Sequence, residues 1–237
     1  MRAIHKGQEP KELAQFRAGA NLSDQHAYEN FPHKGVVRTQ LVAEQRGLCA
    51  FCGGRIVNDP LRMKIAHWKP RLLSVPAPDG GMTFPNLVHQ LDYWNLLGAC
   101  EGNEGQPPAK QHCDTHQGNS PLSKNPANPD HQIEETISFL PDGSITSSDV
   151  QFNWELGCKK PDGNFERGVL NLNLPFLRSN RKETLTAFFV EGLKKRGELT
   201  RAQIQALLCK WRGDAAGALK PYAPVVAYWL RKRLARA

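Results

Sequence analysis

Four cysteines in the first half of the chain have the residue type and spacing of a metal site. Cys49 and Cys52 form a Cys-x-x-Cys pair, and Cys100 and Cys113 follow beside turn residues. A structural zinc ion takes four ligands in a tetrahedron, and a Cys-x-x-Cys turn directs two sulfurs toward one point. We therefore expect these four cysteines to form a structural Zn²⁺ site, with the loop between the last two extruded from it.

Other uses of these cysteines are less well supported. Six cysteines in a 237-residue chain with no secretion-signal pattern are not expected to form a disulfide framework, because the cytosol keeps thiols reduced. A Cys-x-x-Cys pair also serves thiol-redox chemistry, but the βαβ context of that motif is missing here. Redox use of Cys49 and Cys52 stays open as the alternative. Cys158 and Cys209 are interpreted as ordinary thiols.

A histidine and an asparagine lie between the zinc ligands. His67 follows an apolar, strand-like run, and Asn95 precedes a second one. Hydrolysis of a phosphodiester needs a base that activates water and a divalent cation that neutralises charge on the phosphate. Histidine suits the first role, because its ordinary pKa of about 6.5 leaves much of it neutral at pH 7. A packed strand histidine is the commoner use, yet the flanking residues favour His67 as the base.

The elements around these residues follow from periodicity and turn signals. We expect helices at 9–17 and 34–46, the second leading to the cysteine pair, and a loop or arm at 18–32 between them. Short strands are expected at 55–57 and 62–68, joined by a turn. A long loop rich in Pro and Gly then precedes residues 92–97, where compact structure resumes.

The second half of the chain has a different character. A hairpin is expected from 133–140 and 144–146, turning at Asp142 and Gly143. Helices are expected from 175 to about 193, at 200–211 and at 222–236. The predicted fold class is α+β, a zinc-braced core followed by a mainly helical C-terminal region.

Composition limits the functional classes. Lys and Arg outnumber Asp and Glu by 31 to 23, and the formal charge of +8 favours binding to polyanions, nucleic acid above all. No apolar run approaches the ~18 residues of a membrane span. We therefore expect a cytoplasmic protein with no membrane partner.

Three basic clusters are candidates for that contact. They comprise Arg178, Arg181 and Lys182, then Lys194, Lys195 and Arg196, then Arg231, Lys232, Arg233 and Arg236. A solvated helix face is the ordinary explanation of such clusters. The last helix also carries apolar residues, which favour core packing combined with docking of a partner.

Taken together, these motifs resemble the HNH endonucleases, whose ββα-metal fold places a catalytic histidine on a strand. The similarity is closest to the PtuB-type HNH proteins of Septu and retron anti-phage systems, and it extends to about residue 185. It is carried by MRAIHKGQEP (1–10), LVAEQRGLCAFC (41–52), AHWKP (66–70), YWNLLGAC (93–100), HCD (112–114) and VLNLN (169–173), with Leu177 and Arg181.

The resemblance implies a role for each matching residue. His67 would be the general base, and Asn95 would orient the loop that holds it. Asp114, or His116 beside it, would bind the catalytic cation, Mg²⁺ or Mn²⁺. The four cysteines match the structural zinc set. The family also implies an SMC/ABC-type ATPase partner, PtuA, and in retron versions a reverse transcriptase with its DNA–RNA product.

Two positions depart from the family pattern. Ala66 stands where an acidic residue usually precedes the histidine, and Gln117 stands where a lysine is usual. Losing a carboxylate should weaken Mg²⁺ binding, since magnesium relies on oxygen donors. Either Asp114 and His116 suffice, or substrate phosphates supply part of the cation site, or this chain is catalytically weak. The last possibility makes a zinc-stabilised nucleic-acid-binding or scaffold subunit the alternative function.

Three regions are therefore predicted. Residues 1–32 form an N-terminal arm, residues 33–150 the HNH nuclease core with its zinc, and residues 151–237 a helical region for partner docking. The expected function is metal-dependent cleavage of DNA or RNA within a defence complex.

Overall fold

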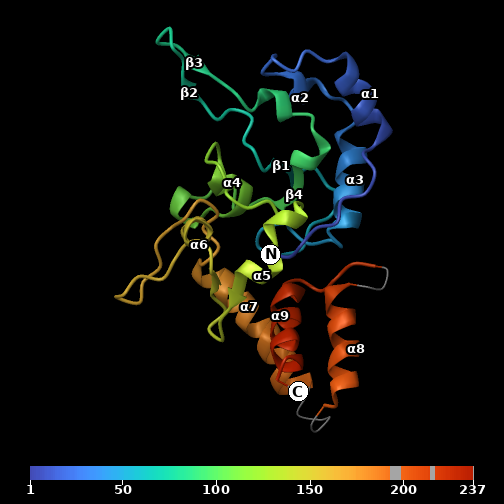
Figure 1. Ribbon diagram of the computed structural model, residues 1–237, viewed down its shortest axis with the longest axis vertical. Coiled ribbons are helices and arrows are strands. Elements are labelled where there is room, and N and C mark those ends of the chain that lie inside the picture. Colours follow the sequence, from blue (N-terminus) through green and yellow to red (C-terminus); the bar gives the residue numbers. More distant parts are fainter. Residues whose placement is uncertain (193–198, 214–216, 237) are drawn as a thin grey trace.

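A computed structural model describes residues 1–192, 199–213 and 217–236. The chain has an α+β fold of short strands and several helices, as expected. Figure 1 shows an elongated molecule, with the N-terminal helices and central strands toward one end and the last three helices at the other. No helix within the described residues has both the length and the apolar character needed to cross a bilayer.

The central feature is an antiparallel pair of strands with a short helix packed on it. Strand β1 (Met63–His67) pairs with β4 (Leu96–Cys100), and α4 (Cys113–Gln117) contacts both. The register places Met63 opposite Cys100 and His67 opposite Leu96. Because the strands run in opposite directions, the end of β1 lies beside the start of β4. This register brings His67 next to Asn95 and puts Cys100 at the far end of the pair.

The N-terminal helices cover this strand pair. They are α1 (Lys11–Gly19), α2 (Ala27–Asn30) and α3 (Lys34–Glu44). The expected loop at 18–32 thus contains a one-turn helix, α2. Leu13, Phe31 and Leu41 are fully buried in the main hydrophobic core together with residues of both strands. Burial of these apolar side chains is the main force that holds the N-terminal segment in place.

The loop between the paired strands carries small elements of its own. Strands β2 (Val75–Pro76) and β3 (Met82–Thr83) form an exposed hairpin that projects from the body in Figure 1. The 3₁₀ helices are η1 (Leu87–His89) and η2 (Tyr93–Asn95) here, and η3 (Pro108–Lys110) and η4 (Pro129–His131) further on.

The expected strand at 55–57 is wrong. Arg55 forms only an isolated bridge with Leu48, and the neighbouring backbone folds back on itself. The amide of Cys49 donates to the Gly54 carbonyl at 2.8 Å, and the amide of Ile56 donates to the Gly47 carbonyl at 3.0 Å. These bonds close the cysteine turn and leave no ladder for a second strand.

The expected hairpin is present but shorter. Strands β5 (Ile137–Phe139) and β6 (Ile145–Ser147) pair across the predicted turn. The preceding residues form the helix α5 (Ile133–Thr136) instead of extending β5, since the amides of Glu135 and Thr136 donate to the Gln132 carbonyl. Helix α6 (Val150–Leu156) follows, and Asp149 caps it by accepting from the Phe152 amide.

The C-terminal region is mainly helical, as expected. Helix α7 (Pro175–Thr186) continues into a π-helical segment, η5 (Ala187–Gly192), and α8 (Arg201–Arg212) and α9 (Ala223–Leu234) lie side by side in Figure 1. Thr200 and Gln203 form a capping box at the start of α8. Helices α8 and α9 pack around a small core of their own, made by Ile204, Leu208, Val226, Ala227 and Leu230.

Candidate metal centre and adjoining histidine site

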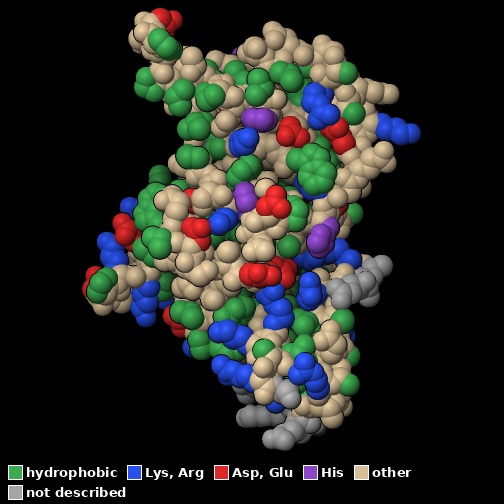
Figure 2. All heavy atoms as spheres, in the orientation of Figure 1, with side chains coloured by type: hydrophobic (Ala, Val, Ile, Leu, Met, Phe, Trp, Pro, Cys, Tyr) green, Lys and Arg blue, Asp and Glu red, His purple; other side chains and the backbone are tan. Residues whose placement is uncertain are grey.

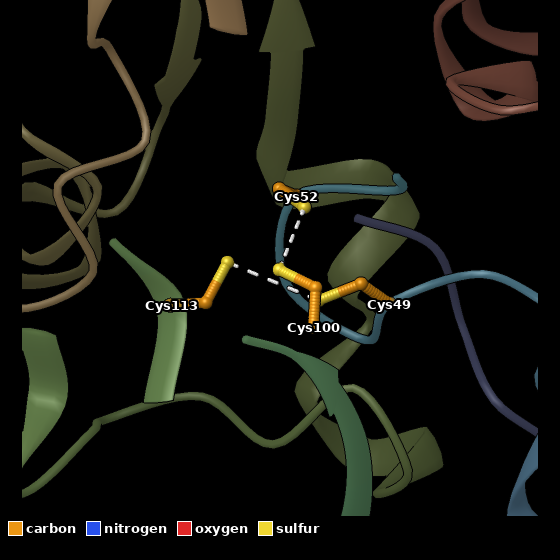
Figure 3. Close-up of side chains that lie close together, drawn as sticks. All are labelled: Cys49, Cys52, Cys100 and Cys113. Carbon is orange, nitrogen blue, oxygen red and sulfur yellow. Dashed lines mark hydrogen bonds between the residues drawn. The ribbon is translucent and has the colours of Figure 1, made fainter. Parts of the chain in front are cut away.

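The four cysteines converge on one point. All four Sγ atoms lie within 4.8 Å of one another, and Figure 3 shows them facing a common centre. Two pairs, Cys49 with Cys113 and Cys52 with Cys100, are each 3.8 Å apart. A tetrahedron with Zn–S bonds of about 2.3 Å has edges of about 3.8 Å, whereas a disulfide needs about 2.0 Å. The cluster therefore fits a zinc ion, and the predicted ligand set is confirmed as a possible metal site.

Local backbone geometry builds this cluster. The turn after α3 directs Cys49 and Cys52 inward, and the Gly54 amide lies 3.3 Å from the Cys52 sulfur. The loop between the last two cysteines is closed at its base, where the His112 amide donates to the Gly102 carbonyl at 3.0 Å. A Cβ atom on Gly102 would lie 2.2 Å from the His112 oxygen, so this close approach requires glycine.

A buried cation accompanies the thiols. Arg181 is 1% exposed, and its guanidinium donates to the carbonyls of Gly143 at 2.6 Å and Leu172 at 2.7 Å. Burial lowers the pKa of Arg181 to about 10, while the nearby Cys52 and Cys113 thiolates act in the opposite direction. Four thiolates on Zn²⁺ carry a net charge of −2, and a buried guanidinium offsets part of it.

His67 is held in one tautomer. Its Nε2 lies 2.9 Å from the carbonyl oxygen of Gln90, which can only accept, so Nε2 carries the proton. The ring meets Tyr28 edge-on, with centroids 4.6 Å apart. Burial lowers the pKa of His67 to about 4, with a smaller contribution from Arg71 that the Gln90 carbonyl opposes. At neutral pH the imidazole is therefore uncharged, with the lone pair on Nδ1.

Asn95 ties together the two ends of the loop beside His67. Its Oδ1 accepts from the Lys69 amide at 2.7 Å, and its Nδ2 donates to the carbonyls of Lys69 and His89, each at 3.1 Å. Every polar atom of the carboxamide is thus used by the backbone. Asn95 therefore holds the backbone of Lys69 and His89 together.

Asp114 and His116 occupy α4, next to the last cysteine. Burial raises the pKa of Asp114, and the charge of Lys64 opposes this shift. Nδ1 of His116 lies 3.0 Å from the Val169 carbonyl oxygen, which can only accept, so Nδ1 carries the proton. The lone pair of the neutral ring is then on Nε2. In the part of the chain that the structure describes, neither Asp114 nor His116 belongs to a group of three or more His, Cys, Asp or Glu side chains within metal-binding distance. The expected cation site would therefore need oxygen atoms from elsewhere.

The two departures from the family pattern lie in packed positions. Ala66 is 1% exposed and pairs with Leu97 in the strand register. Gln117 is buried, its Nε2 lies 3.4 Å from the Trp68 carbonyl, and its Oε1 has no hydrogen-bond partner among the described residues. Neither side chain offers an oxygen at the surface beside His67.

Sequence analysis did not single out the residues that surround His67. Tyr28 lies under two cations, since the Arg71 guanidinium carbon is 4.8 Å and the Lys34 Nζ 5.1 Å from its ring centre. Burial raises the pKa of Tyr28, whereas the charges of Arg71 and Arg38 lower it. Arg38 is thus close enough for its charge to affect the pKa of Tyr28. The signal available was the spacing of Lys34 and Arg38, four residues apart on one helix face.

Arg38 differs from Arg71 in the hydrogen bonding of its Nε atom. Its Nε atom is buried, and no residue in the described ranges accepts a hydrogen bond from it. Arg71 instead pairs with Glu29, with Nη2 and Oε1 2.7 Å apart. Lys34, Arg38 and Arg71 can together attract a phosphate to the neutral imidazole, although Glu29 offsets part of the charge of Arg71.

The basic clusters divide by environment. Arg181 is buried, so it is no part of a surface cluster with Arg178 and Lys182. In the last helix, Arg231 pairs with Glu134 at 3.0 Å, and the Lys232 ammonium lies 5.0 Å from the Tyr228 ring centre. Figure 2 shows Lys and Arg side chains gathered over the part of the molecule that contains α7 to α9. The cluster at 194–196 lies outside the described residues.

Neither a protein-family model nor a curated protein matches this chain. The functional assignment therefore depends on the geometry of the site and on the motifs of the sequence.

Proposed function

We propose that the protein is a metal-dependent HNH endonuclease that hydrolyses phosphodiester bonds in nucleic acid. The observation that carries the proposal is the arrangement of His67 at the end of the β1–β4 strand pair, with α4 and Asp114 packed against that pair. Two antiparallel strands followed by a helix, braced by four cysteines, are the elements expected of a ββα-metal core.

The proposed chemistry uses the neutral imidazole. Nδ1 of His67 takes a proton from the attacking water, while the Gln90 carbonyl fixes the ring through Nε2. A divalent cation, Mg²⁺ or Mn²⁺, would supply charge neutralisation at the phosphate and the leaving oxygen. Asp114 offers it a carboxylate, and His116 offers an imidazole nitrogen. The zinc ion would brace the fold without contacting the substrate.

The distribution of charge supports a nucleic-acid partner. Residues 151–237 contain 17 of the 31 Lys and Arg residues and 7 of the 23 Asp and Glu residues, a net charge of +10, which leaves residues 1–150 at −2. The positive field that attracts a polyanion thus belongs to the C-terminal region. We propose that this region helps to hold nucleic acid and docks the complex's partner.

The sequence motifs extend the proposal to a biological setting. The protein would act in the cytoplasm as the effector of a Septu- or retron-type anti-phage complex, with the PtuA-type ATPase controlling when it cuts. A reverse transcriptase and its DNA–RNA product would join it in a retron version. The basic C-terminal helices are the surface that we assign to these contacts.

A nicking assay tests the nuclease. Supercoiled plasmid and tRNA are incubated with the zinc-loaded protein and Mg²⁺ or Mn²⁺, alone and with the ATPase present. We expect cleavage that His67→Ala abolishes and that His26→Ala, a change of an exposed histidine, leaves intact. Zinc content measured on each variant shows that the fold is retained. Cleavage by His67→Ala at the unmodified rate would refute the assignment.

One observation favours a second candidate, a non-cleaving subunit that binds nucleic acid or scaffolds the complex. Ala66 is buried where the family pattern has an acid, and within the described residues neither Asp114 nor His116 belongs to a group of three or more metal-ligating side chains. Salt-dependent binding of nucleic acid without any divalent-dependent product, even with the ATPase present, would establish this function instead.

A further inference from the structure

A hollow of about 220 Å³ lies beside the loop that Asn95 ties together. Its walls come from the two residues that follow β1, from η1 and η2, and from the segment that leads into η4. The residues that matter for its chemistry are Trp68, Lys69, Asp92, Trp94 and Asn128. None of them has a role in the proposed hydrolysis.

The hollow is close to the candidate base. Trp68 and Lys69 directly follow His67, so their backbone is within about 7 Å of it along the chain. The Trp68 amide donates to the Asn95 carbonyl at 2.9 Å, and the Lys69 amide donates to the Asn95 side chain. The wall of the hollow and the position of His67 are thus fixed by the same residue.

Trp94 provides an exposed aromatic surface at this hollow. It is 54% exposed, although its neighbours Tyr93 and Asn95 are buried. Its backbone is well held, because its amide donates to Asp92 Oδ1 at 3.0 Å and its carbonyl accepts from the Asn125 side-chain Nδ2 at 3.4 Å. A large, rigidly mounted indole open to solvent is suited to stacking on a flat ring.

The rim of the hollow offers hydrogen-bonding groups of both kinds. Asp92 uses one carboxylate oxygen on the Trp94 amide, and Asn128 uses its Oδ1 on the Asp130 amide, so each retains a second polar atom. Carboxylates and carboxamides at such positions pair with the edges of nucleobases.

Charge at the hollow argues against a phosphate there. Asp92 and Lys69 bring one formal charge of each sign, whereas the cations that suit a phosphate surround Tyr28 instead. A neutral, flat ligand with a polar edge fits the Trp94 surface and the polar atoms of Asp92 and Asn128 better than an anion does.

We infer that this hollow binds a nucleobase of the substrate, stacked on Trp94 and adjacent to the phosphodiester that His67 would face. The inference rests on the proposed function for the identity of the substrate, and it specifies unpaired or flipped-out bases, because a base inside a duplex cannot stack on a side chain.

Binding without chemistry tests this site. Fluorescence anisotropy in the absence of divalent cations compares two fluorescein-labelled probes, a twelve-nucleotide oligothymidylate and a twelve-unit chain of abasic phosphodiesters. The full-length, zinc-loaded protein is compared with Trp94→Ala, with Trp94→Phe and with Trp154→Ala. The last variant is the matched control, because Trp154 is an exposed tryptophan on α6 that is 45% accessible.

The expected result is specific to bases. Trp94→Ala weakens binding of oligothymidylate about 5- to 100-fold and leaves the abasic chain unaffected, with an unchanged salt dependence since no charge is lost. Trp94→Phe retains most of the affinity, and Trp154→Ala retains all of it. Equal loss on both probes, no loss with Trp94→Ala, or no binding by the unmodified protein would each overturn the inference.

The same assay keeps the two proposals apart. If the base-specific loss is found but no nucleic acid is ever cut, the nucleobase site stands and the nuclease function fails. If His67-dependent cleavage is found while Trp94→Ala binds normally, the nuclease stands, and the exposed indole is left for contact with a partner protein.

Discussion

Nε2 of His67 donates to the backbone carbonyl of Gln90 at 2.9 Å, and the side chain of Gln90 forms hydrogen bonds with residues 22–28 of the N-terminal segment. The Gln90 Oε1 accepts from the Tyr28 amide at 2.9 Å, and the Gln90 Nε2 donates to the carbonyls of Leu22 at 3.0 Å and Asp24 at 2.9 Å. One fully buried residue therefore fixes both the imidazole and the segment that covers it.

This relationship predicts that Gln90→Leu destabilises the protein by roughly 2–4 kcal/mol. The substitution keeps the volume but leaves the Tyr28 amide and two carbonyls without partners, and each unpaired buried group costs about 1–3 kcal/mol. Urea unfolding of the zinc-loaded protein measures the change, with the exposed Gln25→Leu as the control. Equal stability of the two variants would contradict the clamp.

The depressed pKa of His67 predicts a pH dependence of stability. The pKa falls from its ordinary 6.5 to about 4 on folding, chiefly through burial. Below pH 6.5 the unfolded chain takes up a proton that the folded chain does not, so the free energy of unfolding falls as the pH drops toward 4. Between pH 7.5 and 5 the unmodified protein should lose roughly 2 kcal/mol more than His67→Gln. His26→Gln should lose as much as the unmodified protein.

How much of this site the sequence predicts depends on the range of each contact. Cys49 and Cys52 are placed by a local turn, and their spacing reveals it. His67 and Asn95 meet through one strand register, which the apolar runs of β1 and β4 indicate. The hydrogen bond between Gln90 and Tyr28 joins residues 62 positions apart, and the segment around Tyr28 has no hydrophobic periodicity. No local sequence pattern therefore predicts this contact.

The two wrong predictions, a strand at 55–57 and a surface position for Arg181, have related causes. The apolar Ile56 suggested a strand, but its amide is used by the Gly47 carbonyl to close the cysteine turn. Arg181 belongs to a basic run that looked like surface, yet the fold buries it among carbonyls close to the thiols. In both cases tertiary contacts override a local preference, and the same side chain would have suited either environment.

Removal of the metal should unfold the core. Cys113, the first residue of α4, is fully buried. Without a metal, the four thiols of the cluster would remain close together without the bonds that a zinc ion provides. We expect one zinc per chain by elemental analysis, and a loss on the order of 5 kcal/mol or more on chelation or in Cys113→Ser. Cys158→Ser, outside the cluster, should retain both zinc and stability.

The buried guanidinium predicts a long-range effect on that metal. Arg181→Met removes the positive charge that offsets the thiolates, so zinc affinity should fall about 10- to 100-fold in competition with a chromophoric chelator. Arg181→Lys should recover part of this loss, because it keeps the charge but not the fork that bonds two carbonyls. Lys182→Met is the control: Lys182 is the next residue and is exposed, so this change should leave zinc affinity unchanged.

The cations around Tyr28 predict where a phosphate of the nucleic acid is held. Arg38 has a buried Nε without a partner in the described chain, and Arg71 lies 4.8 Å from the Tyr28 ring, which itself packs on His67. A phosphate placed there would offset the charge of Arg38 and face the imidazole. Each side chain should therefore account for one phosphate contact, and replacing either by Gln should remove it.

Salt dependence provides the measurement for that contact. Loss of one phosphate contact lowers the slope of log K against log salt by about 0.7 for a single strand and 0.9 for a duplex. Arg38→Gln and Arg71→Gln should each show this change with an oligonucleotide in the absence of divalent cations. Arg62→Gln, an exposed arginine just before β1, removes the same charge away from Tyr28. Arg62→Gln should therefore leave the slope unchanged. If Arg38→Gln and Arg71→Gln also leave it unchanged, or if all three variants lower it equally, the phosphate is not bound at this site.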